Sequence, residues 1–201
     1  PGVILERGST MPLFGPPNVG RLEAKNDVKG LIQVLSYHLD DPDRAKYEPL
    51  RQAAVDALVR IGQLAVRPLM DKFRSAAGKQ RESIAQVLVM IGPPAVPELI
   101  ETMLENRGKR NYLPYEIAEI LNKIGDPRAI EPLIAVLAYP PITLEGRILN
   151  ALRDFGAQAV EPLRVVVLND RNMDARRAAA TALQHIGLPA LDALVDAFMI
   201  G

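Results

Sequence analysis

The stretch LRQAAVDALVRIGQLAVRPL, residues 50–69, decides the fold of this 201-residue chain. In its first half, Leu, Ala and Val recur at helical spacing, which predicts an amphipathic helix that packs closely against another helix. Gly62 then ends this helix, because glycine accepts the left-handed backbone found at helix C-termini. Pro68 stands near the start of the next apolar run, where a helix tolerates the missing backbone N–H. The stretch therefore predicts a first helix, a tight turn and a second helix.

This two-helix pattern recurs along the chain. The apolar-Gly pairs of the turns follow one another at intervals of 30, 33, 31 and 31 residues: Ile61-Gly62, Ile91-Gly92, Ile124-Gly125, Phe155-Gly156 and Ile186-Gly187. Such internal repetition is typical of a solenoid, in which each unit buries its apolar face against its neighbours. We predict an all-α fold, a right-handed α-α superhelix built from helix pairs.

The repeats predict one solenoid domain with an N-terminal extension. We expect residues 1–10 to be expression-derived residues or an upstream linker, and residues 11–46 to form a cap and half a repeat, with a second helix over residues 27–35. The five repeats are predicted at about 47–75, 76–105, 110–138, 143–169 and 172–201. Residues 198–200 are apolar, whereas a terminal repeat normally presents a polar face, so we expect the chain to continue or to be covered there. Self-association through this C-terminal helix is one such cover.

The composition argues against several kinds of function. The 24 basic and 24 acidic residues cancel, which counts against a nucleic-acid binder. There is no Cys, and the two His, His38 and His185, lie far apart, so we predict no metal, no cofactor and no catalytic residue. No apolar run has the ~20 residues of a bilayer span, and no secretory signal is visible. We expect a soluble, cytoplasmic protein that does not bind a membrane.

Three motifs together resemble a known family. They are an Arg-x-x-Ala first helix (Arg51 to Ala54), the Ile-Gly turn, and a Val-x-Pro-Leu second helix (Val66 to Leu69). The chain from about residue 27 to residue 201 resembles the HEAT-like repeat family, specifically the short repeats of phycobilisome chromophore lyases. The resemblance implies a scaffold more often than an enzyme, with the second helices lining a concave surface.

Charged side chains on the second helices are the predicted docking surface. They follow the leading apolar residue of each helix by one or a few positions: Arg67, Asp71, Glu98, Glu101, Glu131, Glu161, Arg164, Asp192 and Asp196. Their acidic C-terminal part predicts a groove for a basic or amphipathic protein segment. The alternative is that the carboxylates only complement the dipoles of the helix N-termini.

The connections between units provide a second candidate patch, in three loops that contain tyrosine. Its predicted members are Tyr37, Arg107, Lys109, Arg110, Tyr112 and Tyr139. Because loops at equivalent positions of a solenoid lie along one edge, these residues predict a contact ridge with tyrosine anchors. A solvated loop without a partner is the alternative.

Arginines early in the first helices complete the set of candidate residues: Arg51, Arg81, Arg147, Arg176 and Arg177. The resemblance implies that they bridge neighbouring repeats, with contact to nucleic acid as the alternative.

We predict a non-enzymatic scaffold that binds a protein on its second helices. One alternative is a bilin chromophore lyase or a lyase subunit, which is implied by the resemblance alone. The other is a HEAT-like nucleic-acid-binding protein.

Overall fold

The computed structural model describes residues 16–109, 111–137, 145–192 and 195. Within these ranges every regular element is an α-helix or a short 3-10 helix, and no strand occurs. The α-helices are α1 (Val19–Ala24), α2 (Val28–Leu35), α3 (Glu48–Ile61), α4 (Gln63–Ser75), α5 (Gly78–Ile91), α6 (Val96–Glu105), α7 (Leu113–Ile124), α8 (Ile130–Leu137), α9 (Glu145–Phe155), α10 (Ala157–Asn169) and α11 (Met173–Ile186). Four 3-10 helices accompany them: η1 (Arg44–Tyr47), η2 (Pro93–Ala95), η3 (Pro127–Ala129) and η4 (Leu188–Ala190).

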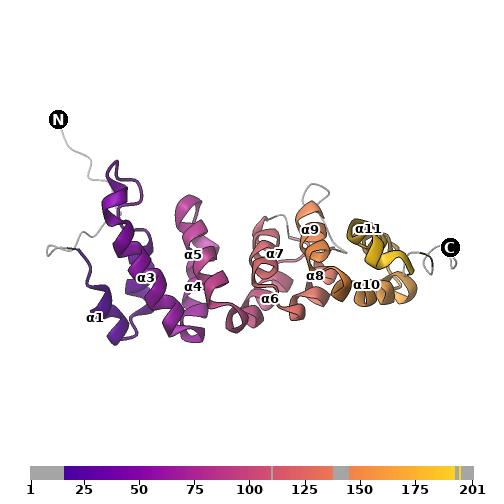
Figure 1. Cartoon of the computed structure of the whole chain (residues 1–201), viewed down its shortest axis with the longest axis horizontal. Helices are drawn as coiled ribbons and strands as arrows, with labels where there is room; N and C mark the ends of the chain where they lie inside the picture. Colours follow the sequence, from indigo (N-terminus) through magenta and orange to yellow (C-terminus); the bar gives the residue numbers. More distant parts are fainter. Residues whose placement is uncertain (1–15, 110, 138–144, 193–194, 196–201) are drawn as a thin grey trace.

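The helices alternate between two layers of an elongated stack (Figure 1). The odd-numbered helices α1 to α11 form layer A, in which each helix contacts the next odd-numbered one. The even-numbered helices α2 to α10 form layer B, in which the same rule holds. The predicted all-α helical repeat is confirmed, and the right-handed sense of the superhelix stays a prediction.

The core consists of aliphatic side chains that fill the space between layers A and B. Helix α3 shows why, since Ala54, Ala57 and Leu58 share one face and are fully buried. Alanine removes side-chain bulk where the helices of layer A lie against one another, and leucine fills the space between layers. Because this core has no single centre, each unit is stabilised by its direct neighbours.

The turns inside the units share one backbone geometry with one exception. Gly92 has φ 73° and ψ −137°, and Gly62, Gly156 and Gly187 lie close to these values. A residue with a Cβ rarely adopts this combination, so the turn selects glycine. Gly125 instead has φ 70° and ψ 21°, the ordinary left-handed helical region that asparagine also tolerates.

Two of the second helices begin earlier than the sequence predicts. In α4 and α10 the residues directly after the glycine are already helical, so that Pro68 and Pro162 lie inside the helix. The N–H of Ala65 donates to Gly62 O at 2.9 Å, and Ala95 donates to Gly92 O in the same way in the unit where a separate 3-10 turn precedes α6. The same tight turn therefore opens both kinds of second helix, and only its junction with the α-helix differs.

No single helix among the described residues combines the length and apolarity needed to cross a membrane. One pair, Gly78–Ile91 with Pro93–Glu105, passes on length and composition only when its two helices are taken together, and it is bent by 110° at the break.

Candidate functional site

Several side-chain contacts fix the connection between α2 and α3. Arg51 on α3 is 6% exposed and donates from Nη1 to Tyr37 O and from Nη2 to Arg44 O, both at 2.9 Å. Its guanidinium also contacts the Glu48 carboxylate. A buried cation is tolerated only when hydrogen bonds and opposite charge replace its hydration. Arg51 therefore holds residues 36–47, which we call the α2–α3 loop, against α3.

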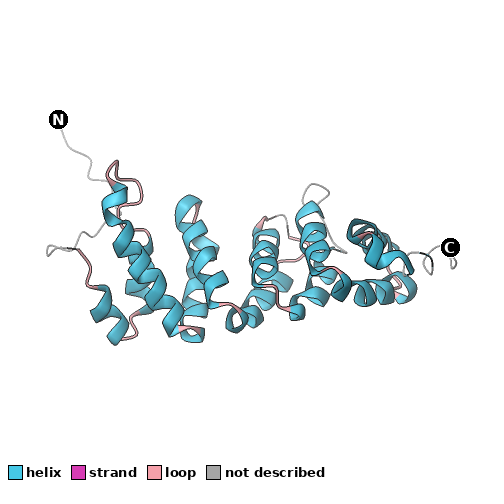
Figure 2. Ribbon diagram, in the orientation of Figure 1, coloured by secondary structure: helices cyan, strands magenta, loops and turns pink. Residues whose placement is uncertain are grey.

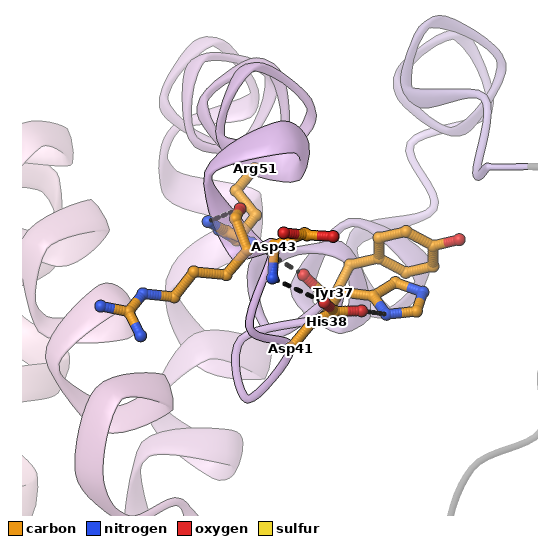
Figure 3. A network of polar contacts seen from close by, with 6 residues as sticks. Tyr37, His38, Asp41, Asp43 and Arg51 are labelled. Carbon is orange, nitrogen blue, oxygen red and sulfur yellow. Dashed lines mark hydrogen bonds and ion pairs between the residues drawn. The ribbon is translucent and has the colours of Figure 1, made fainter.

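Aromatic rings close the base of the α2–α3 loop. The Tyr37 and Tyr47 ring centroids lie 5.4 Å apart, and His38 stacks on Tyr47 at 4.3 Å. His38 has φ 51°, and its Nδ1 lies 3.1 Å from Asp41 Oδ2. Figure 3 shows Arg51 on the side of the loop opposite the Tyr37 and His38 rings. The loop is thus fixed from both sides, by a cation and by a ring cluster.

A groove of about 350 Å³ opens between the α2–α3 loop, α3 and α5. Leu35, Leu39 and Val55 contribute its apolar surface. Its volume falls within the range of small-molecule sites. We call this space the α3–α5 groove.

Two cations of the α3–α5 groove lack an acidic partner. Among the described residues, neither Arg44 nor Lys79 has a carboxylate within 4.0 Å, and both side chains are exposed. Glu82 on α5 also lines the groove, and Arg51 and Glu48 pair with each other. The groove therefore combines an apolar surface with two cations that are available to an anion.

The other arginines of the first helices also join neighbouring units. Arg81 on α5 contacts Glu116 on α7 and donates to Ala76 O at 3.3 Å. Arg147 pairs with Glu119 at 2.8 Å, which connects α9 to α7. Arg176 donates to Val167 O at 2.8 Å, which connects α11 to the end of α10. Arg177 differs, because it is exposed and lies 3.8 Å from Asp174 on its own helix.

The predicted docking residues of the second helices lie on layer B. Those that the structure describes as exposed are Arg67, Asp71, Glu101, Glu131, Glu161 and Asp192. Glu98 and Arg164 are half-buried, and Asp196 lies outside the described residues.

Arginines on the same helices partly neutralise this acidic row. Arg164 donates to both Glu161 carboxylate oxygens at 2.9 Å, and this hydrogen-bonded guanidinium holds the pKa of Glu161 below its usual range. Arg74 lies 3.4 Å from Asp71. The row is therefore less acidic than the spacing of its carboxylates suggests.

The predicted tyrosine ridge is only partly described. Tyr112 is 68% exposed and Arg107 and Lys109 are exposed, whereas Arg110 and Tyr139 lie outside the described residues. Tyr37 packs within the ring cluster of the α2–α3 loop instead of pointing to solvent as an isolated anchor. The described connections that lead into α3 and α7 lie along one edge of the stack (Figure 2).

The two histidines have local partners. His38 faces Asp41, and His185 Nδ1 lies 2.9 Å from Thr181 O on the same helix. Within the described part of the chain, no group of three or more His, Asp or Glu side chains is arranged to hold a metal ion.

The stacked helix pairs, their glycine turns and the arginines between units define a helical-repeat protein of the HEAT-like class. The model of the PBS lyase HEAT-like repeat matches residues 113–139, which include α7 and α8. The phycocyanobilin lyase subunit alpha of Picosynechococcus sp. (strain ATCC 27264 / PCC 7002 / PR-6) is 30% identical over 191 residues, which cover 89% of this chain and 71% of the relative. The chain belongs to the phycobilisome-lyase type of HEAT-like repeat proteins.

This relationship corrects one prediction. The sequence predicts a protein that is not an enzyme, because no catalytic motif is visible. The relative is named as a subunit of a lyase, and this contradicts that prediction. The prediction relied on the absence of clustered nucleophiles, histidines and metal ligands, and the absence of such motifs does not exclude an enzyme.

Proposed function

We propose that the chain is a subunit of a bilin lyase, which acts in the attachment of an open-chain tetrapyrrole to an acceptor protein. The observation that carries the proposal is the likeness to a phycocyanobilin lyase subunit along 89% of the chain, far beyond one repeat. The α3–α5 groove is consistent with it, since a small-molecule site needs a concave, partly apolar surface with a few polar groups.

The experiment that tests this proposal is a transfer assay. The chain, a candidate second subunit, phycocyanobilin and an unmodified acceptor protein are incubated together, and the acceptor is separated under denaturing conditions. We expect visible absorbance that stays with the acceptor and exceeds the absorbance obtained without the chain. Equal absorbance with and without the chain, for every second subunit tried, would contradict the proposal.

A second proposal concerns the acceptor or the second subunit, and one specific observation favours it. Each layer B helix from α4 to α10, and the start of the helix after η4, carries at least one exposed charged residue. A repeat array offers such a row as one extended docking surface, and charge complementarity then selects the partner. We propose that the row binds a basic or amphipathic segment of that protein.

Charge reversal on layer B tests the docking proposal. We expect Glu131→Lys combined with Glu161→Lys to weaken binding of the protein partner, measured by surface plasmon resonance at low salt. The matched control is Asp40→Lys combined with Asp174→Lys, which changes the charge equally at exposed positions in the α2–α3 loop and in the first turn of α11, away from the layer B helices. Unchanged affinity in the layer B variant would end the docking proposal and would leave the lyase proposal in place.

A further inference from the structure

We propose that the α3–α5 groove is the bilin site, and that Arg44 and Lys79 bind the two propionate carboxylates of the tetrapyrrole. This inference rests on the proposed lyase function and adds to it a location and two recognition residues. It follows from four features of the groove: its unpaired cations, its apolar surface, its polar wall and its fixed shape.

The position of Lys79 is the first argument. Lys79 is the second residue of α5, where the positive end of the helix dipole disfavours a cation. No carboxylate among the described residues lies within 4.0 Å of it, so neither the helix nor an ion pair explains a lysine there. A ligand anion in the groove explains it, because the anion would interact favourably with both the lysine and the helix end.

Arg44 provides the second cation from a different element. It is the first residue of η1, its backbone carbonyl accepts from Arg51, and its own side chain is exposed in the groove. Two cations on separate walls fit a ligand with two carboxylates better than a ligand with one. A bilin has two propionates of this kind, whereas a basic peptide would be repelled by both cations.

The remaining lining fits the body of a bilin. Leu35, Leu39 and Val55 offer apolar contact to conjugated rings. Glu82 and Gln86, one helical turn apart on α5, place acceptor oxygens in the same groove. Pyrrole N–H groups are hydrogen-bond donors that would otherwise lose their water without compensation. The groove therefore offers complementary groups to each part of the molecule.

The shape of the groove does not depend on a ligand. Arg51 and the ring cluster hold the α2–α3 loop to α3 from within. Across the connection, Gln80 Nε2 on α5 donates to Ser36 Oγ at 2.8 Å. Both walls are thus fixed before binding, which reduces the ordering cost that binding would otherwise carry.

The test compares a bilin with its dimethyl ester. Free phycocyanobilin and its dimethyl ester are titrated into the full chain, and binding is followed by the change in visible absorbance. We expect the wild-type protein to bind the diacid about tenfold more tightly than the ester, which corresponds to about 1.4 kcal/mol shared between the two lost ion pairs. Arg44→Gln combined with Lys79→Gln should weaken binding of the diacid by about tenfold and abolish its preference over the ester.

The control variant removes two cations elsewhere. Lys123→Gln combined with Arg171→Gln makes the same change of charge at exposed positions outside the groove lining, and we expect wild-type binding. Both single variants, Arg44→Gln and Lys79→Gln, should show intermediate affinities. Circular dichroism of every variant verifies that the helical stack is intact.

The outcomes separate the site from the function. If the groove variant binds the diacid as tightly as the wild type, the groove is not the propionate site, even when bilin transfer succeeds. If the wild type shows the carboxylate preference and the variant loses it, while transfer to an acceptor fails, the site stands and the lyase proposal falls. If the wild-type protein does not bind bilin at all, the inference is overturned, and the transfer assay decides the function separately.

Discussion

Two steps from layer B to layer A of the same stack are built differently. Between α10 and α11 the connection is residues 170–172, closed by the Asn172 side chain, which accepts from the Asp174 and Ala175 N–H groups. Between α2 and α3 the connection is residues 36–47, and the equivalent arginine, Arg51, gathers two carbonyls and one carboxylate instead of the single carbonyl that Arg176 meets. At the short connection, Arg176 only joins two neighbouring helices. At the longer connection, Arg51 holds the α2–α3 loop in place, and this loop lines the α3–α5 groove.

The largest effect should come from removing the two equivalent arginines. We expect Arg51→Ala to lower the free energy of unfolding by about 3 kcal/mol, because it leaves the Tyr37 and Arg44 carbonyls without their charged donor and also removes the ion pair with the exposed Glu48 carboxylate. Arg176→Ala should lower it by about 1 kcal/mol, since one hydrogen bond is lost at a partly exposed site. Urea unfolding followed by circular dichroism measures both values. Equal losses would show that the two steps do not differ as described.

The turns inside the units provide a second contrast. Gly92→Asn should lower the free energy of unfolding by about 2 kcal/mol, because ψ near −137° at positive φ is strained for any residue with a Cβ. Gly125→Asn should cost less than about 1 kcal/mol, because asparagine tolerates φ 70° with ψ 21°. Both introduced Cβ atoms would lie about 4 Å from the nearest atoms, so crowding does not confuse the comparison. Thermal unfolding midpoints of the two variants test it.

The two histidines should differ by about 1 kcal/mol or less in their contribution to the free energy of unfolding. His38→Ala should destabilise the chain by about that amount, since it removes a ring that stacks on Tyr47 and contacts Tyr37 edge-on. His185→Ala should change stability by less than about 0.5 kcal/mol, because His185 is exposed and contacts only its own helix in the described structure. Hydrogen exchange of the α2–α3 loop should increase in the first variant alone.

The smallest effect is a pH dependence at the N-terminal end. Arg60 on α3 hydrogen-bonds to Glu23 on α1 at 2.6 Å, and this hydrogen bond lowers the pKa of Glu23. Because the pKa is lowered in the folded state, the contribution of Glu23 to stability is present above its ordinary pKa and disappears as the pH falls through the lowered value. Arg60→Gln should raise the pKa of Glu23, as measured by carboxyl NMR titration. An unchanged titration would show that the pair does not form in solution.

The architecture could be predicted from the sequence because it depends on local patterns. Helical spacing and the five Gly turns fix the helix pairs, and the offset of Arg51 from Gly62 marks the arginine between units. The α3–α5 groove could not be predicted in this way, because Arg44 and Lys79 line it from two elements that are distant in the sequence. One correction was within reach of the sequence: Glu161 and Arg164 are three residues apart on a helix, which places them beside each other.

The stack also behaves as a one-dimensional chain of contacts, because each helix of layer A meets the next helix of that layer. In such a chain, unfolding spreads from an end and must break one junction at a time. A molecule held between the α2–α3 loop and α5 would span the junctions nearest the N-terminal end and act there as a staple. Release of this molecule would lower the hydrogen-exchange protection of the first units and leave that of the last units unchanged. Ligand binding would then change the local stability mainly at the N-terminal end of the protein.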